Sequence, residues 1–281
     1  MSGKSLCLYH NDLDGRASAA VLKRLLRPSK CTYLPTQYGD ELPLEKFDNL
    51  YILDYSLEPE ILKKLIRDDV RVVWIDHHGP VIEKYKDFKT PIPGVREEGK
   101  AGCELTWEYC THRQKPLPRY LELLSEYDAW KGGGPSQDAL ALVFASAMYE
   151  TKMPDDKFWA DIMNGTFVNK LIRDGSIILQ YRKQFYRDLI DDIGYDTELA
   201  GVKCHALNVG RVGPTEVRAA PFNKLPVTIS FYFDGDKYIC SLYSETVDVS
   251  KLAQKFGGGG HKGASGFTAK TLPFKMSSTE K

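Results

Sequence analysis

The sequence lacks several features that mark common classes of protein. No apolar run approaches the roughly 20 residues of a membrane-spanning helix. No apolar signal region follows Met1-Ser2-Gly3-Lys4. No Cys-x-x-Cys pair, the spacing typical of thiolate zinc sites, occurs among Cys7, Cys31, Cys103, Cys110, Cys204 and Cys240. These absences argue against a disulfide framework and favour a cytoplasmic protein with reduced thiols and no membrane association.

The sequence also lacks a net charge, because 38 Lys and Arg residues match 38 Asp and Glu residues. Proteins that grip long duplexes usually carry a strong basic surplus. The balance therefore argues against a long duplex as partner and is compatible with a short anionic substrate. With 281 residues, of which 42% are hydrophobic, the chain can bury the core of one large or two medium domains.

Residues 1–80 alternate between strand-like and helix-like patterns. We predict strands at Leu6–Tyr9, Leu50–Leu53 and Val70–Ile75, a short strand at Thr32–Leu34 ended by Pro35, and helices at Ala17–Leu26 and Pro59–Ile66. Alternation of this kind produces a parallel sheet with helices on both faces. We therefore expect a parallel-sheet α/β domain at the start of the chain.

Helical spacing dominates the middle of the chain. The predicted helices are Cys103–Cys110, Leu117–Tyr127, 139–148 after a glycine-rich break at 132–135, and a long helix at Lys157–Ile190 interrupted near Asn164-Gly165. We interpret the long helix as a connector between two domains.

After Asp191 the pattern changes to strands with one short helix. The predicted strands are Val202–Val209, Val227–Phe233, Tyr238–Tyr243 and Gly266–Ala269, and the helix is Val249–Phe256. The predicted fold class is therefore α/β, with an N-terminal parallel-sheet domain, a helical connector and a smaller mixed α/β domain. We place these parts at residues 1–150, 151–195 and 196–281.

Polar side chains that favour hard metal ions follow three of the predicted strands. The first strand is followed by His10, Asp12 and Asp14, the second by Asp54, and the third by Asp76, His77 and His78. Parallel strands present their carboxyl ends at one edge of the sheet, so we expect the three clusters to converge. Carboxylates packed together repel each other unless cations hold them, which predicts a metal site.

Each residue of these clusters has an ordinary structural alternative. Asp14 could cap a helix that begins near Gly15, and Asp54 could belong to an ordinary turn. Those alternatives do not explain why three of only six histidines stand beside the acids. Carboxylate and imidazole ligands suit Mn²⁺, with Mg²⁺, Co²⁺ or Fe²⁺ as alternatives, whereas structural zinc usually takes thiolates. Asp128 is the candidate for a further acidic ligand. Its alternative is an ordinary acidic residue in the loop after a helix.

The pattern resembles the DHH phosphoesterase superfamily. The resemblance is carried by His10-Asn11-Asp12-Leu13-Asp14-Gly15, Asp54, Asp76-His77-His78 and Asp128, which look like its four motifs. The segment Gly257–Phe267, with sequence GGGGHKGASGF, looks like the signature of the associated DHHA1 domain. The resemblance reaches both ends of the chain, with the motifs in the family's order.

The resemblance implies two Mn²⁺ ions per chain. It implies a first ion held by His10, Asp12 and Asp54. It implies a second ion held by Asp14, Asp54, His77 and Asp128, with Asp54 bridging the two. By the same resemblance Asp76 would support the centre or add a ligand, and His78 would contact the scissile phosphate or support the metals.

The glycine segment would act on the substrate rather than on the metals. Four glycines in a row are more often a flexible loop, but here the run ends a predicted helix and continues into a cationic pair, His261-Lys262. Small residues let a phosphate approach the backbone, and the cations supply charged donors. The predicted substrate contacts are Gly258, Gly259, Gly260, His261 and Lys262, with Arg218 as a weaker candidate whose alternative is a solvated loop residue.

These features predict hydrolysis of a P–O bond, because the sequence has neither a Walker motif nor an order typical of a covalent nucleophile. From the resemblance we expect an Mn²⁺-dependent exonuclease of the nanoRNase type, of either polarity, acting on short RNA or DNA or on dinucleotides. The alternatives are a phosphohydrolase for cyclic dinucleotides or nucleoside bisphosphates, and a catalytically inactive nucleotide-binding subunit. The last alternative conflicts with the intact ligand set, and the signature of the second domain of family II pyrophosphatases is absent. Whether two copies form a homodimer is left open.

Overall fold

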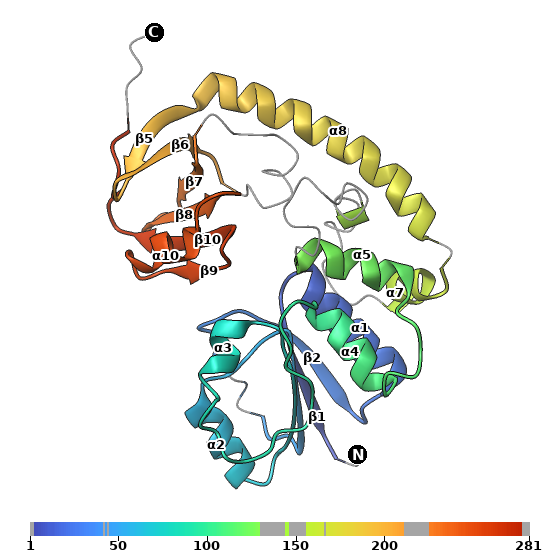
Figure 1. Cartoon of the computed structure of the whole chain (residues 1–281). Helices are drawn as coiled ribbons and strands as arrows, with labels where there is room; N and C mark the ends of the chain where they lie inside the picture. Colours follow the sequence, from blue (N-terminus) through green and yellow to red (C-terminus); the bar gives the residue numbers. More distant parts are fainter. Residues whose placement is uncertain are drawn as a thin grey trace. The chain divides into compact units, whose positions relative to one another are not determined.

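The computed structural model describes residues 3–41, 43, 45–129, 144–145, 156–165, 167–210 and 225–276 (Figure 1). The chain divides into two compact units, residues 1–175 and 176–281, and the division falls within helix α8 (Val168–Ile193). The predicted break at 132–135 and most of the predicted helix at 139–148 lie outside the described residues.

The first unit contains a four-stranded parallel sheet. Its strands are β1 (Ser5–His10), β2 (Cys31–Thr36), β3 (Asn49–Leu53) and β4 (Arg71–Ile75). Their order is β2-β1-β3-β4, and every neighbouring pair is parallel. The predicted parallel sheet is confirmed.

Helices cover both faces of this sheet, as Figure 1 shows. Helices α1 (Leu13–Leu25) and α4 (Gly102–Cys110) cover one face, and α2 (Pro59–Arg67) and α3 (Gly79–Glu83) cover the other. Helices α5 (Arg119–Asp128) and α7 (Asp156–Met163) pack in a cluster with α1 and α4. Alternate residues of β1 serve the two faces: Leu8 packs in a cluster with Leu62, whereas Tyr9 packs in a cluster with Leu105 on α4. A strand that is buried on both faces is a continuous apolar run in the sequence, as β1 and β3 are.

One local expectation about this unit was wrong. Pro35 lies within β2 instead of ending it, paired with Tyr9. Because β2 is an edge strand, the missing N–H of proline costs no ladder hydrogen bond on its open side. The alternative role considered for Asp14, as the cap of α1, does not occur: the helix begins at Leu13, and Asp12 is the cap, accepting a hydrogen bond from the Gly15 N–H at 2.9 Å.

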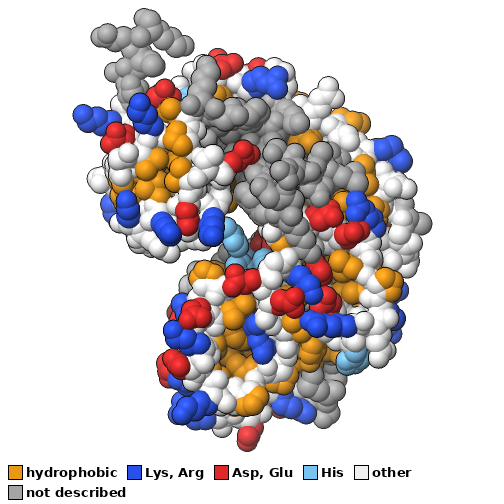
Figure 2. Space-filling model, in the orientation of Figure 1, with side chains coloured by type: hydrophobic (Ala, Val, Ile, Leu, Met, Phe, Trp, Pro, Cys, Tyr) orange, Lys and Arg blue, Asp and Glu red, His pale blue; other side chains and the backbone are white. Residues whose placement is uncertain are grey.

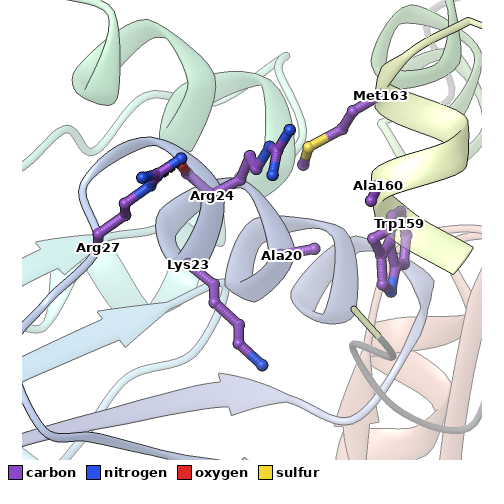
Figure 3. A pocket seen from close by; sticks show the side chains of 7 residues that line it. All are labelled: Ala20, Lys23, Arg24, Arg27, Trp159, Ala160 and Met163. Atoms are coloured by element: carbon purple, nitrogen blue, oxygen red, sulfur yellow. Dashed lines mark hydrogen bonds between the residues drawn. The ribbon is translucent and has the colours of Figure 1, made fainter. Parts of the chain in front are cut away.

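The expected interruption of the long helix near Asn164-Gly165 is confirmed, because α7 ends at Met163 and α8 begins at Val168. Helix α7 packs beside α1 in the first unit. Between them lies a cavity of about 220 Å³, lined by Ala20, Lys23, Arg24, Arg27, Trp159, Ala160 and Met163 (Figure 3). None of the predicted site residues lines this cavity.

The second unit is a mixed sheet with one short helix, as expected. Its strands are β5 (Tyr195–Leu199), β6 (Val202–Asn208), β7 (Val227–Phe233), β8 (Tyr238–Tyr243), β9 (Gly259–Gly260) and β10 (Ala264–Ala269), in the order β5-β6-β7-β8-β10-β9. Among these described strands, β6 and β7 are the one parallel pair. Helix α10 (Val249–Gln254) packs on the sheet through Val249, Leu252 and Ala253. Strands β5 and β9 were not predicted.

The described residues contain no helix that is both long and apolar enough to cross a bilayer. All six cysteines are free, and four of them are buried. On the face drawn in Figure 2, acidic and basic side chains are interspersed rather than separated into fields of one sign. This distribution agrees with the zero net charge of the sequence.

Candidate metal centre

The three ligand clusters meet at the carboxyl edge of the first unit's sheet. Asp54 directly follows β3, and His77 lies two residues beyond the end of β4. The Nε2 atom of His77 lies 3.1 Å from Oδ1 of Asp54, 3.7 Å from Oδ2 of Asp14 and 3.3 Å from Oδ2 of Asp128. One imidazole is therefore faced by Asp14 and Asp128, which are more than 100 positions apart in the sequence.

The ligand atoms form overlapping groups, each compact enough to hold one metal ion. The groups are His10, Asp12 and Asp54; Asp14, His77 and Asp128; and Asp54, His77 and His78. In the first group, Nδ1 of His10 lies 2.7 Å from Oδ2 of Asp12 and 3.8 Å from Oδ2 of Asp54. The sets that the family resemblance implies correspond to the first two groups, joined through Asp54.

The carboxylate of Asp54 belongs to the first group and also contacts the second. Its Oδ2 faces His10 and its Oδ1 faces His77, so the two oxygens point to different groups. The side chain is 1% exposed, and neither oxygen accepts a hydrogen bond from a described residue. Burial and the neighbouring carboxylates, Asp14 and Asp12 first, raise the pKa of Asp54 well above its usual value. A buried carboxylate without hydrogen bonds is costly unless a cation compensates it.

The backbone at Asp54 is also unusual. Its φ angle is +52°, in the left-handed region that residues other than glycine seldom adopt. Its N–H donates to the carbonyl of Ile75 at 2.8 Å, which ties the turn after β3 to the end of β4. Strained residues of this kind persist where the surrounding structure fixes them, often at functional sites.

These observations show that the residues fit a pair of divalent cations. The donors are carboxylate oxygens and imidazole nitrogens, and no thiolate belongs to any of the three groups. Such donors suit Mn²⁺, Mg²⁺ or Co²⁺ better than a structural zinc ion. One cation would be held by each of the first two groups, with the orphaned oxygens of Asp54 shared between them.

Asp14 has a second task at the start of α4. Its Oδ2 accepts from the Gly102 N–H at 2.6 Å, and its Oδ1 accepts from the Cys103 N–H at 2.7 Å. The residue before the helix, Ala101, has no side chain that could cap it. A carboxylate at this position satisfies otherwise unpaired N–H groups and complements the helix dipole. The helix N-terminus in turn fixes the orientation of a predicted ligand.

Glycine at position 15 is required by close packing next to the first motif. A Cβ atom there would lie 2.0 Å from the carbonyl oxygen of His10, which no side chain can tolerate. The glycine lets the first turn of α1 fold back over the end of β1. His10 and Asp14 are thereby brought to the same edge from a single tight strand-to-helix turn.

Asp76 belongs to none of the three metal groups and instead holds His78. Its Oδ1 accepts from the backbone N–H groups of His77 and His78 at 2.8 and 3.2 Å. The same oxygen lies 2.7 Å from Nδ1 of His78, and Trp74 Nε1 donates to Oδ2 at 3.3 Å. Burial lowers the pKa of His78, but the hydrogen bond and charge of Asp76 outweigh it and raise the pKa to about 9. The arrangement orients an imidazole at the edge of the metal groups.

Asp128, the fourth predicted acid, reaches the site from the end of α5. One turn earlier, Ser125 accepts from the Ala101 N–H at 3.2 Å and donates to Oε2 of Glu104 at 2.5 Å. Ser125 is fully buried, and Glu104 is 8% exposed. These contacts join α5 to the start of α4, so Asp128 is positioned by buried polar contacts rather than by a free loop.

The site is bordered by two tyrosines that the sequence analysis did not single out. Tyr38 lies in the turn after β2, with its ring centroid 6.1 Å from that of His10 and 5.0 Å from that of Tyr55. Tyr55 is buried, but Tyr38 is 54% exposed. Partial desolvation and the negative charge of Asp76 raise the pKa of Tyr38, so the phenol stays neutral at ordinary pH.

The predicted glycine contacts form an ordered turn in the second unit. Gly257 follows α10 with φ +76°, the usual conformation of a glycine that ends a helix. Gly259 and Gly260 form the edge strand β9 against β10, and His261 and Ala264 exchange backbone hydrogen bonds across the tip. His261 and Lys262 are exposed there. Arg218 lies outside the described residues.

Gly102, Cys103 and Ser125 also escaped the sequence interpretation. The sequence points to Gly102 and Cys103 only indirectly. The helix that begins after Ala101 has no Ser, Thr, Asp or Asn as its cap, so its first N–H groups require an acceptor from elsewhere in the fold. Nothing in the spacing of Ser125 or Tyr38 distinguishes them from ordinary helix and turn residues.

Comparisons with known proteins agree with this geometry. The family model described as "DHH family, N-terminal domain" matches residues 5–126. An uncharacterized protein of Acanthamoeba polyphaga mimivirus is 26% identical over 92% of this chain, and the chain spans 66% of the length of that relative.

Two solved structures share the fold at low sequence identity. One is the DHH domain of a protein described as a member of a family of ribosomal proteins, 16% identical with a TM-score of 0.53, covering 94% of this chain and 82% of that one. The other is PggH, a pGpG-specific phosphodiesterase from Vibrio cholerae, 13% identical with a TM-score of 0.50, covering 94% of this chain and 92% of that one. The family match identifies residues 5–126 as a DHH-type N-terminal domain, and the two solved structures share the fold.

Proposed function

We propose that this protein is a two-metal phosphodiesterase that hydrolyses short oligonucleotides or dinucleotides to mononucleotides, with Mn²⁺ as its preferred cation. The observation that carries the proposal is the position of Asp54, a buried carboxylate whose two oxygens lack hydrogen bonds and face two different ligand groups. The ligand groups joined by Asp54 would hold two divalent cations, which when bound would supply a nucleophilic hydroxide and neutralise charge on the phosphoryl group.

The chain's own residues perform the remaining tasks. Asp14 and Asp54 are buried and fixed, so the ligand atoms are arranged before substrate binds. His78 is held by Asp76 through Nδ1, so a contact between this ring and a phosphate oxygen would be made by Nε2. A protonated imidazole next to a phosphate donates a charge-assisted hydrogen bond. Asp76 therefore acts as a positioning residue, and His78 is the candidate for direct contact with the substrate.

The choice of a short substrate rests on charge and on similarity. The net charge is zero and the charged side chains on the drawn face are mixed, so the protein lacks the basic surplus that long nucleic acids favour (Figure 2). The similarity in fold to a phosphodiesterase for pGpG, a linear dinucleotide, supports a substrate of that size. That similarity favours a linear dinucleotide over a cyclic one or a nucleoside bisphosphate.

The second unit is assigned to substrate binding in this proposal. The turn at Gly258–Lys262 combines three glycines, which leave its backbone uncovered by side chains, with two exposed side chains that can be cationic. Such a turn suits the phosphate or sugar of a nucleotide. Gly259 and Gly260 are held in the edge strand β9, which fixes the turn rather than leaving it as a loose linker.

A panel of substrates tests the proposal. Purified protein, first stripped of metal and then supplied with Mn²⁺, Mg²⁺ or Co²⁺, would be incubated with pApA, short RNA, short DNA, a cyclic dinucleotide, a nucleoside 3′,5′-bisphosphate and pyrophosphate. We expect fastest turnover with Mn²⁺ on the linear dinucleotide or short RNA, and none without metal.

Matched variants make the test specific. Asp54→Ala should lower turnover by several powers of ten, at about 1.4 kcal/mol of barrier per tenfold, whereas Asp87→Ala, which removes an exposed acid of the same unit, should not. Turnover that survives complete removal of metal would contradict the two-metal mechanism. Exclusive cleavage of cyclic dinucleotides, bisphosphates or pyrophosphate would replace the proposed substrate class.

A further inference from the structure

Tyr38 lies beside the metal ligands without belonging to them. It follows β2, and the last residue of β2, Thr36, is paired with His10 at the end of β1. The ring of Tyr38 is therefore delivered to the same sheet edge as the first ligand group. The ring centroids of Tyr38 and His10 are 6.1 Å apart.

The turn that carries Tyr38 is fixed on both sides. The Gln37 N–H donates to Oδ2 of Asp40 at 2.8 Å, and the Asp40 N–H donates to the Gln37 carbonyl at 3.1 Å. The Tyr55 hydroxyl, on the buried side, donates to the same carbonyl at 3.4 Å. The backbone on either side of Tyr38 is thus anchored to the fold. This distinguishes Tyr38 from an aromatic residue at the tip of a loose loop.

The ring itself is supported but not covered. It lies against the ring of buried Tyr55, with centroids 5.0 Å apart and planes at 39°. More than half of Tyr38, 54%, nevertheless remains exposed. A supported aromatic ring that leaves such an area open beside a phosphate-binding centre has the properties of a stacking platform.

We propose that Tyr38 stacks on the nucleobase next to the scissile phosphate and so makes the enzyme selective for phosphodiesters of aromatic bases. The proposal rests on the phosphodiesterase function proposed above and names the feature of the substrate that this site recognises. A base is joined to its phosphate through one sugar, so a phosphate bound by the metal groups places its base near the rim that Tyr38 occupies. Stacking accepts every base, because each base has an aromatic face.

The competing explanation is that Tyr38 acts through its hydroxyl, which lies near Ser56 and Asp76. The two explanations separate by substitution. Tyr38→Phe keeps the ring and removes the hydroxyl, whereas Tyr38→Ala removes both. Tyr181→Ala is the matched control, because Tyr181 is an exposed tyrosine of α8, 69% accessible, and has no part in the metal centre.

The experiment measures binding directly. The probe is a linear dinucleotide in which methylene groups replace the bridging oxygens of the phosphodiester, so that its charge remains but it cannot be hydrolysed. One version of the probe carries the fluorescent base 2-aminopurine, and a matched version carries hydrogen in place of that base. Both versions are prepared twice, with the change at the first nucleoside and then at the second. Affinities are measured by calorimetry in Mn²⁺, and the quenching of 2-aminopurine reports stacking.

The expected result is selective. Tyr38→Ala should weaken binding of the base-bearing probe by about 5- to 150-fold, the range for loss of one base–aromatic stack, and should abolish part of the quenching. Binding of the base-free probe should be unchanged. Tyr38→Phe and Tyr181→Ala should behave like the wild type, and Mn²⁺ content should be equal in all variants.

Three outcomes would overturn the inference, and a fourth would overturn the function on which it rests. Equal weakening of both probes by Tyr38→Ala, or none, would exclude stacking. A loss with Tyr38→Phe as large as with Tyr38→Ala would assign the role to the hydroxyl. If the wild-type protein hydrolyses phosphodiesters but binds both probes equally, the Tyr38 inference alone fails. If it hydrolyses no phosphodiester, the proposed function fails with it.

Discussion

Gly102 donates its backbone N–H to the carboxylate of Asp14 across 88 residues of sequence, at 2.6 Å. The same glycine leaves room for the proposed bridging residue, because a Cβ atom at position 102 would lie 2.7 Å from Cβ of Asp54 and 3.1 Å from Oδ2 of Asp14. The start of helix α4 therefore packs against Asp54 and Asp14 so closely that only a glycine fits at position 102 without displacing its neighbours.

This contact predicts that Gly102→Ala weakens metal binding. The new methyl group must displace Asp54, Asp14 or the start of α4, and strain of this kind costs about 1–3 kcal/mol of stability. We expect Mn²⁺ affinity, measured by calorimetry, to fall at least tenfold in this variant.

Gly201→Ala provides the control for that variant. Gly201 has φ +87° and open space around it, so alanine there should cost a similar stability, about 1–3 kcal/mol, through backbone strain alone. Its Mn²⁺ affinity should equal that of the wild type. Unchanged metal affinity in Gly102→Ala would show that the close approach does not constrain the ligands.

The Asp76–His78 pair predicts a pH dependence of stability in the metal-free protein. The pKa of His78 rises from its ordinary 6.5 to about 9, because the hydrogen bond and charge of Asp76 outweigh burial. A raised pKa means that the folded state holds the proton more tightly than the unfolded state. The stabilisation is therefore complete below pH 6.5 and is lost as the pH rises through about 9.

Asp76→Asn should remove this dependence. Urea unfolding with chelator present, at pH values from 6 to 10, should show the wild-type advantage over Asp76→Asn shrinking as the pH rises. His112→Asn, which replaces an exposed histidine, should keep the wild-type profile. Parallel profiles for wild type and Asp76→Asn would contradict the assignment of Asp76 as the partner that charges His78.

His261→Ala should separate the roles of the two units. His261 is exposed on the glycine turn of the second unit, whereas the predicted ligands all belong to the first. We expect unchanged Mn²⁺ content but at least tenfold lower kcat/KM on pApA, with a smaller loss on bis-(p-nitrophenyl) phosphate, which needs less positioning.

The pattern of loss in His261→Ala decides between two other roles for the residue. An equal loss on both substrates would place His261 in the chemical step. No loss on either substrate would make the glycine turn a structural feature of the sheet edge.

The fold was largely predictable from local periodicity. Strands β7 and β8 have the predicted bounds, and the break between α7 and α8 falls where Asn164-Gly165 predicted it. The errors have physical causes. Pro35 stays in a strand because that strand is at the edge of the sheet, and the two-residue strand β9 exists only through pairing with β10.

The candidate site was predictable only in part. The motif residues could be identified because the carboxyl ends of parallel strands meet at one edge of the sheet. Residues that directly follow such strands are therefore expected to lie close to one another. The capping of α4 by Asp14 is a contact between distant segments and leaves no periodic trace. Tyr38 likewise owes its position to the pairing of β2 with β1 and to the ring of Tyr55, neither of which a turn sequence reveals.

The central claim is that Asp54 holds two cations in one centre, and electron paramagnetic resonance of the Mn²⁺-loaded protein tests it most directly. At two equivalents of Mn²⁺ per chain, ions about 3.5–4 Å apart should give the spectrum of an exchange-coupled pair. Asp54→Ala should give only the signal of isolated ions. A wild-type spectrum of isolated Mn²⁺, with saturation at one ion per chain, would contradict the account.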